Sequence, residues 1–247
     1  MLDILIRNSH FLLLGAYPDG PLGGLALTLI LSLTGLAFAC PLGVLLALCR
    51  VSPYKLLRVP SAVLIYIVRG VPLVMLVFWS YFLVPGLIGH LVSAFTTLVV
   101  TLVIYQAAYL CEIVRAGIES LPKGQTESAR SLGLGYGATM RHVILPQALF
   151  NMLPSLLSQC VSTVKDTSIG YVISVQELTF SAQQINASLL TQPFQVFSIL
   201  ALTYFVVCYA LTRGAHVVER RIARRRATGK MPELRSVAQA FLSDLRH

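Results

Sequence analysis

The chain has 247 residues, of which 56% are hydrophobic and only 12% are charged. A soluble domain carries about 25% charged residues, so these charges are too few to cover a water-facing surface and much of the surface must face lipid. The formal net charge is +9, and five arginines gather directly after an apolar run: Arg220, Arg221, Arg224, Arg225 and Arg226. No aromatic residues alternate with them, so we interpret them as a determinant of membrane topology rather than a nucleic-acid site.

Five segments are long and apolar enough to cross a membrane, which takes about 20 residues. In chain order they lie at about 24–48, 62–84, 95–114, 145–164 and 194–215. The fourth carries Gln147, Asn151 and Gln159, so we expect it to face the protein interior rather than lipid. The sequence therefore predicts an all-α integral membrane protein with about five transmembrane helices.

The basic residues predict how these spans are oriented. The first and third connections carry four lysines or arginines each, and nine more follow from Arg213 to Arg246. The opposite side has only Arg7 and Lys165. Because short cytoplasmic loops are enriched in positive charge, five spans predict a periplasmic N-terminus and a cytoplasmic C-terminus in a bacterial inner (cell) membrane.

The polar loop at about 116–146 is the most informative stretch. Glu127 and the small residues around it predict a short cytoplasmic helix, preceded by Gly124 and ended by Gly133 and Gly135. Such a helix can insert into a groove of a partner protein. On spacing alone, an ordinary solvated loop helix explains the same pattern equally well.

Several segments resemble one transporter family. The EAA motif of ABC importer permeases is similar to Glu127-Ser128-Ala129, Gly133 and Ile144-Leu145-Pro146, with Ser128 where alanine is usual. The polar amino-acid branch of that family is similar in further segments: Ala107-Ala108-Tyr109, Arg115-Ala116-Gly117-Ile118, Lys165-Asp166-Thr167-Ser168 and Arg69-Gly70-Val71-Pro72-Leu73. The run through Trp79 and Val84-Pro85-Gly86 is most similar to the glutamate/aspartate importers.

This resemblance implies a type I ABC importer transmembrane domain that moves polar amino acids, glutamate or aspartate in particular, across the inner membrane by alternating access. Import of glutamine, histidine or another polar amino acid is the alternative. The implied partners are ABC ATPase subunits, a second permease subunit of the same or a similar chain, and a periplasmic amino-acid-binding protein. The residues implied to contact the ATPase are Gly124, Glu127, Ser128, Ala129, Leu132 and Gly133.

Charged and polar residues close to the spans are candidates for the substrate path or for gating. Glu112 and Arg115 lie three residues apart on one helix face, where they can also form a purely structural pair. Arg69 can pair with Glu112 or serve as a topology anchor. The complete candidate set is Arg69, Pro72, Glu112, Arg115, Lys165, Asp166, Thr167 and Ser168.

No catalytic machinery is expected in this chain. The phosphate-binding pattern G-x-x-x-x-G-K-[ST] is absent, because Gly229-Lys230 is followed by Met231. We therefore expect no cofactor bound by this chain, with ATP and Mg used by a separate ATPase subunit, and no metal site. An intramembrane enzyme and an ion channel are the competing classes. The enzyme would need a catalytic acid, base or metal cluster near one membrane depth, and none is visible in the sequence. The channel would predict a filter segment or an all-apolar gate rather than a glycine-bounded cytoplasmic helix.

The chain is expected to divide into three parts. Residues 1–23 form a periplasmic segment, residues 24–226 the transmembrane domain, and residues 227–247 a cytoplasmic tail. Apolar residues recur in the tail at helical spacing, which predicts an amphipathic helix on the inner membrane surface, with a disordered end as the alternative.

Overall fold

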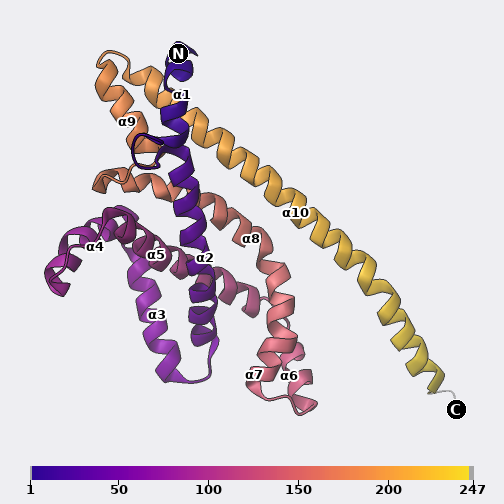
Figure 1. The fold of residues 1–247 in the computed structure, drawn as a ribbon. Helices are drawn as coiled ribbons and strands as arrows, with labels where there is room; N and C mark the ends of the chain where they lie inside the picture. The colour runs from indigo at the N-terminus through magenta and orange to yellow at the C-terminus, as the bar shows by residue number, and fades with distance from the viewer. Residues whose placement is uncertain (1, 245–247) are drawn as a thin grey trace.

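The computed structural model describes the backbone of residues 2–244, together with the side chains of residues 3–222 and of Arg224. These residues form helices and short connections, and no strand occurs among them (Figure 1). The elements are α1 Leu2–Leu14, α2 Gly24–Val51, α3 Lys55–Gly70, α4 Leu73–Ile88, α5 Ala94–Glu119, α6 Lys123–Ser131, α7 Tyr136–Thr139, a π-helical turn Met140–Ile144, α8 Leu145–Asp166, a 3-10 helix Thr167–Ile173, α9 Leu178–Leu189 and α10 Pro193–Asp244.

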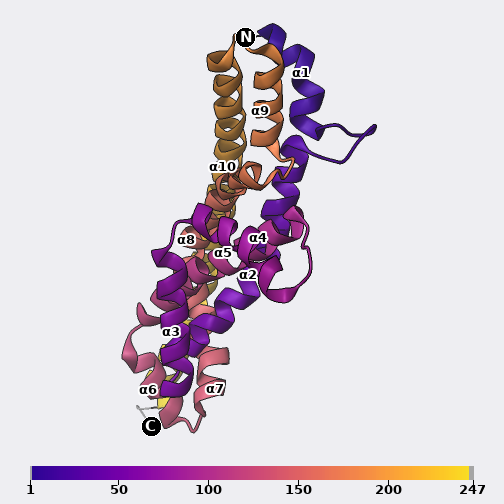
Figure 2. The same ribbon diagram turned by 90° about the vertical axis from the view of Figure 1, so that its left-hand side faces the viewer.

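The molecule is elongated, with its two ends built from different elements. Figures 1 and 2 both place α1, α9 and the start of α10 at one end, and α6, α7 and the connection between α2 and α3 at the other. We call the second of these the coupling end. The candidate sites can therefore be located along one axis that runs between the two ends.

Helices α2 and α5 form the centre of the fold, and small residues allow them to approach closely. A buried stripe of α2 consists of Leu31, Gly35, Ala39, Gly43 and Ala47. A Cβ atom added to Gly43 would lie 2.8 Å from the Leu110 Cβ atom and 3.1 Å from the Ala107 carbonyl oxygen. Since such small-residue stripes are the usual contact between helices in membranes, we interpret this pair as the rigid scaffold of the domain.

The predicted second span is not one continuous helix. The chain breaks between α3 and α4 and turns through 102°. Val71 at the break is extended, with φ −107° and ψ 135°. Pro72 explains this conformation, because its ring disfavours a helical residue before it and it has no N–H to continue the helix. The prediction of one helix across 62–84 is therefore wrong, although α3 and α4 together still pass the test of length and apolarity for a span.

Three helical stretches within the described residues are long and apolar enough to cross a membrane: Gly24–Val51, Ala94–Glu119 and Pro193–Ile222. The bent pair α3–α4 makes a fourth if it counts as one span. Helix α8 coincides with the predicted fourth span but does not meet the same test of apolarity. Its polar residues agree with the expectation that this helix faces protein.

Candidate functional site

Helix α6 confirms the short helix predicted around Glu127. It begins at Lys123 after Pro122, so Gly124 lies inside its first turn and does not precede it as predicted. Glu127 and Ser128 are exposed, whereas Ala129 is buried against the rest of the protein. The helix therefore presents one polar face outward.

The end of α6 leaves an apolar side chain in solvent. Leu132, the C-cap, is 83% exposed. Gly133 follows with φ +83°, a left-handed conformation that glycine adopts without the steric cost of a Cβ atom. The exposed Leu132 beside a polar helix face is a typical contact for a partner protein.

Specific contacts join α6 and α7 to the membrane helices. The Gln147 amide donates a hydrogen bond to the Gln125 side chain at 3.2 Å, which links α8 to α6. The Tyr136 hydroxyl donates to the Val51 carbonyl at 3.1 Å, which links α7 to the end of α2. These two hydrogen bonds connect the α6–α7 segment to α2 and α8.

Glu112 lies at the centre of an arginine cluster. Its carboxylate is 2.8 Å from Arg115, 2.9 Å from Arg50 and 3.7 Å from Arg69. The Glu112 side chain is only 16% exposed. Arg115 also pairs with Glu119 one turn later. The predicted pairings of Glu112 with Arg115 and with Arg69 are both present. Together with Arg50 they connect α2, α3 and α5.

Aromatic rings hold two of these arginines from the other side. The Arg50 guanidinium lies 5.1 Å from the centre of the Tyr66 ring, and that of Arg69 lies 4.9 Å from the centre of the Tyr109 ring. Arginine stacks favourably on such rings because its charge meets the negative ring face. The bend after Gly70 therefore leaves Arg69 fixed between α3 and α5.

A second polar group lies between α5 and α8. The fully buried Gln106 amide donates to Asp166 at 2.8 Å, and the Gln159 amide donates to Gln106 at 2.6 Å. Thr167 is also buried, and Ser168 is partly exposed. This chain of two amides and a carboxylate, of which only Gln106 is fully buried, contains both hydrogen-bond donors and acceptors.

Lys165 does not join that group. Its side chain lines a separate cavity of about 290 Å³ between α8 and α10, together with Thr212, His216 and Glu219. No ion pair between Lys165 and Asp166 is found among the described side chains. The predicted run Lys165–Ser168 is thus divided: Lys165 lines the cavity beside α10, and Asp166 belongs to the polar group between α5 and α8. Pro72, another predicted site residue, acts through the bend between α3 and α4 rather than through a polar contact.

Glu177 forms a buried junction at the opposite end of the molecule. Its carboxylate accepts hydrogen bonds from the backbone N–H groups of Thr179 and Phe180 at 2.8 and 3.0 Å, and from the Tyr204 hydroxyl at 3.1 Å. Burial raises the pKa of the Glu177 carboxyl to about 7, although these donors favour the charged form. The junction caps α9 and ties it to α10.

Several of these residues were not singled out by the sequence. Arg50 was counted only as a loop charge, Gln159 only as a sign that its helix faces protein, and Gln106 and Glu177 were not selected. A buried glutamine or glutamate within an apolar run is a signal that could have marked them. Their hydrogen-bond partners could not be predicted in the same way, because a pair such as Gln106 and Asp166 lies more than 50 positions apart in the chain.

The comparison with protein families decides what this architecture is. The family described as "Binding-protein-dependent transport system inner membrane component" matches residues 39–224. The chain belongs to this family. The match covers α3 to α9 completely, including α6, the arginine cluster and the amide chain.

Curated bacterial proteins of this family are similar over most of the chain. The inner membrane amino-acid ABC transporter permease protein YhdY of Escherichia coli K12 is 37% identical over 85% of this chain, which spans only 57% of that relative's length. The probable glutamine ABC transporter permease protein GlnP of Bacillus subtilis is 35% identical over 83% of this chain and 97% of its own length.

Solved structures give the same fold. A crystal structure of an amino acid ABC transporter with histidines is 34% identical, with a TM-score of 0.74 over 80% of this chain and 92% of that one. An inward-facing MetNI methionine ABC transporter aligns with a TM-score of 0.64 at 19% identity, over 90% and 97% of the two chains. The chain thus has the all-helical type I ABC importer transmembrane fold, as predicted.

Proposed function

We propose that this chain is the transmembrane permease subunit of an ATP-driven importer of polar amino acids. The observation that carries the proposal is the family match over residues 39–224, which includes the exposed α6. The ATPase would be a separate subunit, as the relatives are permease subunits by name. A second permease subunit and a periplasmic amino-acid-binding protein complete the proposed assembly.

The proposed role of α6 is to couple the ATPase to the membrane helices. Its outward face offers Gly124, Glu127 and Ser128, and exposed Leu132 and Gly133 follow at its end. Ala129 holds the helix against the permease from the inner side. Closure of the ATPase subunits would push α6, and the contacts of α6 and α7 to α2 and α8 would pass this movement on to the substrate path.

The amino acid carried is proposed from the relatives. The names of three bacterial relatives give glutamine, cystine and arginine. We therefore propose a polar amino acid, with glutamine as the first substrate to test. A neutral amide side chain also suits the buried amides of Gln106 and Gln159 beside Asp166. This group, with Thr167 and Ser168, is the proposed polar part of the path.

The first test is whether an ATPase is retained. We expect an ABC ATPase subunit from the same organism to co-purify with the wild-type chain and to be lost from Glu127→Lys, because the new charge lies on the outward face of α6. Ser131→Ala, a change at an exposed residue of the same helix, is the control and should retain the ATPase. Equal retention by Glu127→Lys would rule out α6 as the contact.

The second test addresses the substrate. Uptake of labelled glutamine into vesicles that contain the whole transporter is measured in competition with unlabelled amino acids. Strong competition by glutamine and weak competition by glutamate supports the proposed choice. Competition by glutamate and aspartate alone would instead support the glutamate/aspartate specificity expected from the resemblance in the second predicted span.

A further inference from the structure

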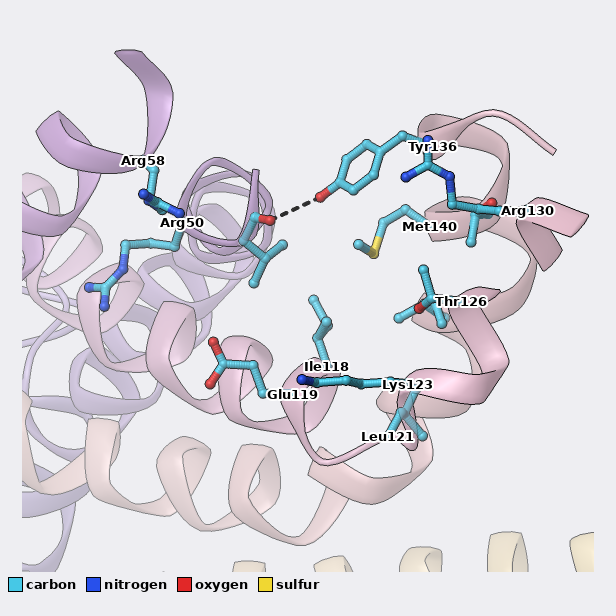
Figure 3. Close-up of a pocket in the computed structure, with 13 residues that line it drawn as sticks. Arg50, Arg58, Ile118, Glu119, Leu121, Lys123, Thr126, Arg130, Tyr136 and Met140 are labelled. Carbon is cyan, nitrogen blue, oxygen red and sulfur yellow. Dashed lines mark hydrogen bonds between the residues drawn. The ribbon is translucent and has the colours of Figure 1, made fainter. Parts of the chain in front are cut away.

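A cavity of about 510 Å³ at the coupling end has no role in the proposed transport path (Figure 3). It is enclosed by the end of α2, the start of α3, the end of α5, and α6 and α7. Figure 3 shows Arg50 and Arg58 on one side of the space and Lys123 and Arg130 on the other. The Tyr136 hydroxyl closes part of its rim through the hydrogen bond to Val51.

The charges around this cavity are not balanced. Arg50 pairs with Glu112, and Glu119, the one carboxylate in the lining, pairs with Arg115. Among the side chains that the structure describes, no ion pair involves the remaining three lining cations: Arg58, Lys123 and Arg130. Three unpaired cations from two separate elements thus surround one space, and an anion bound there would remove their mutual repulsion.

An apolar groove continues from the cationic cavity. A second cavity of about 340 Å³ shares Arg50, Arg58 and Glu119 with the first and extends along α3. Its remaining lining is Arg115, which is paired with Glu112 and Glu119, and four residues of α3: Val59, Ala62, Val63 and Tyr66. The combined shape is cationic at the coupling end and apolar along a helix that leads toward the membrane interior.

We propose that these two cavities together bind an anionic phospholipid of the cytoplasmic leaflet. The phosphate group would lie among Arg58, Lys123 and Arg130, and an acyl chain would lie along Val63 and Tyr66 of α3. Phosphate is the chemistry recognised, and the apolar groove favours a lipid over free phosphate, which would leave it empty. The inference rests on the proposed orientation, which places the coupling end at the cytoplasmic surface.

The consequence of the binding would be mechanical. Arg58 belongs to α3, which leads into the bend at Pro72, whereas Lys123 and Arg130 belong to α6. A lipid phosphate between them would join the helix that contacts the ATPase to the helix that carries Arg69. Coupling of ATP hydrolysis to transport would then depend on anionic lipid.

The test measures lipid retained by the complete transporter, with its ATPase, after purification from nanodiscs of phosphatidylcholine and phosphatidylglycerol. Native mass spectrometry should find phosphatidylglycerol enriched on the wild type and about fivefold less enriched on Arg58→Gln, since one basic residue near a membrane surface contributes about that factor. Lys55→Gln is the matched control, because Lys55 is exposed at the start of the same helix and lines neither cavity.

Two further measurements complete the test. In the first, the lipid-free complex is titrated with inorganic phosphate in a calorimeter, and we expect the wild type and Arg58→Gln to give the same result. If instead the wild type binds phosphate, Arg58→Gln does not, and no lipid is enriched, the cavity binds a soluble anion and the lipid proposal is wrong. In the second, Val63→Cys is made in a background without the native cysteines. A disulfide between two copies would show that a second subunit covers the groove, and this would also contradict the lipid proposal. Equal enrichment of phosphatidylglycerol on Arg58→Gln and on the wild type would likewise contradict the lipid proposal. Retention of the ATPase by Arg58→Gln separates this result from a failure of the proposed function.

Discussion

At the scale of residues, Glu112 balances three arginines from three helices. Arg115 donates two hydrogen bonds to the Glu112 carboxylate, and Arg50 and Arg69 form ion pairs with it. The Tyr66 and Tyr109 rings contribute on the outer sides of Arg50 and Arg69. Removing the carboxylate would leave Arg50 and Arg69 without a counter-charge, whereas Arg115 would keep Glu119. The connection between α2, α3 and α5 thus depends on the single carboxylate of Glu112.

We predict that Glu112→Gln lowers the free energy of unfolding by about 3 kcal/mol, the usual order for breaking a largely buried ion pair. Thermal unfolding of the purified protein in detergent measures this as a lower Tm. Glu119→Gln is the control, because Glu119 is 55% exposed and such surface pairs contribute about 0.5 kcal/mol. Equal Tm values for the two variants would contradict the assigned role of Glu112.

We predict that Glu177, at the end of the molecule opposite the coupling end, makes stability depend on pH. Its pKa of about 7 in the folded protein lies above the ordinary value of 4.5, so the folded state binds the proton more tightly than the unfolded state. The contribution of Glu177 to stability should therefore be fully present below about pH 4.5, be lost as the pH rises to about 7, and change no further above that. Glu177→Gln should flatten this part of the profile, measured as Tm against pH. An unchanged slope in the variant would assign the dependence to another group.

At the scale of elements, the bend between α3 and α4 shows how one dipeptide redirects an apolar run. Hydropathy alone favours a straight helix across 62–84, since nearly every residue there is apolar. Pro72 prevents it through backbone geometry, to which hydropathy does not respond. The same element also positions Arg69 next to Glu112 rather than at the end of a straight span.

We predict that Pro72→Ala straightens the bent pair in part, because Val71 regains access to helical backbone angles. Spin labels at Val63 and Leu83, both exposed and on opposite sides of the bend, should then move apart in electron spin resonance distance measurements. Pro85→Ala, which changes a proline inside α4 beyond the bend, is the control. An unchanged distance in Pro72→Ala would show that packing on α5, rather than proline, fixes the bend.

At the scale of the whole molecule, the proposed orientation can be tested directly. A cysteine at Leu91, which is 97% exposed between α4 and α5, should react with a membrane-impermeant maleimide in intact spheroplasts. A cysteine at Leu132 should react only after the membrane is opened, because α6 is proposed to face the cytoplasm. Both variants are made in a background without the native cysteines. The reverse pattern would invert the topology and remove the basis for the proposed ATPase and lipid contacts.

The predicted tail begins inside α10. The backbone continues α10 as a helix to Asp244, which agrees with the helical spacing of apolar residues after position 226. The amphipathic face predicted there lies outside the described side chains. The division into a periplasmic segment, a transmembrane domain and a cytoplasmic tail therefore stays a prediction.

The sequence by itself determined the class of protein, the positions of α2, α5 and α8, the start of α10 and the short helix around Glu127. These follow from composition, apolar length and local turn residues, which act over a few positions of the chain. Only the tertiary structure decided that Arg50 completes the Glu112 cluster, that Asp166 contacts Gln106 while Lys165 faces α10, and that Arg58, Lys123 and Arg130 surround one cavity. Such groupings depend on how helices far apart in the chain pack together, and local patterns carry no record of that packing.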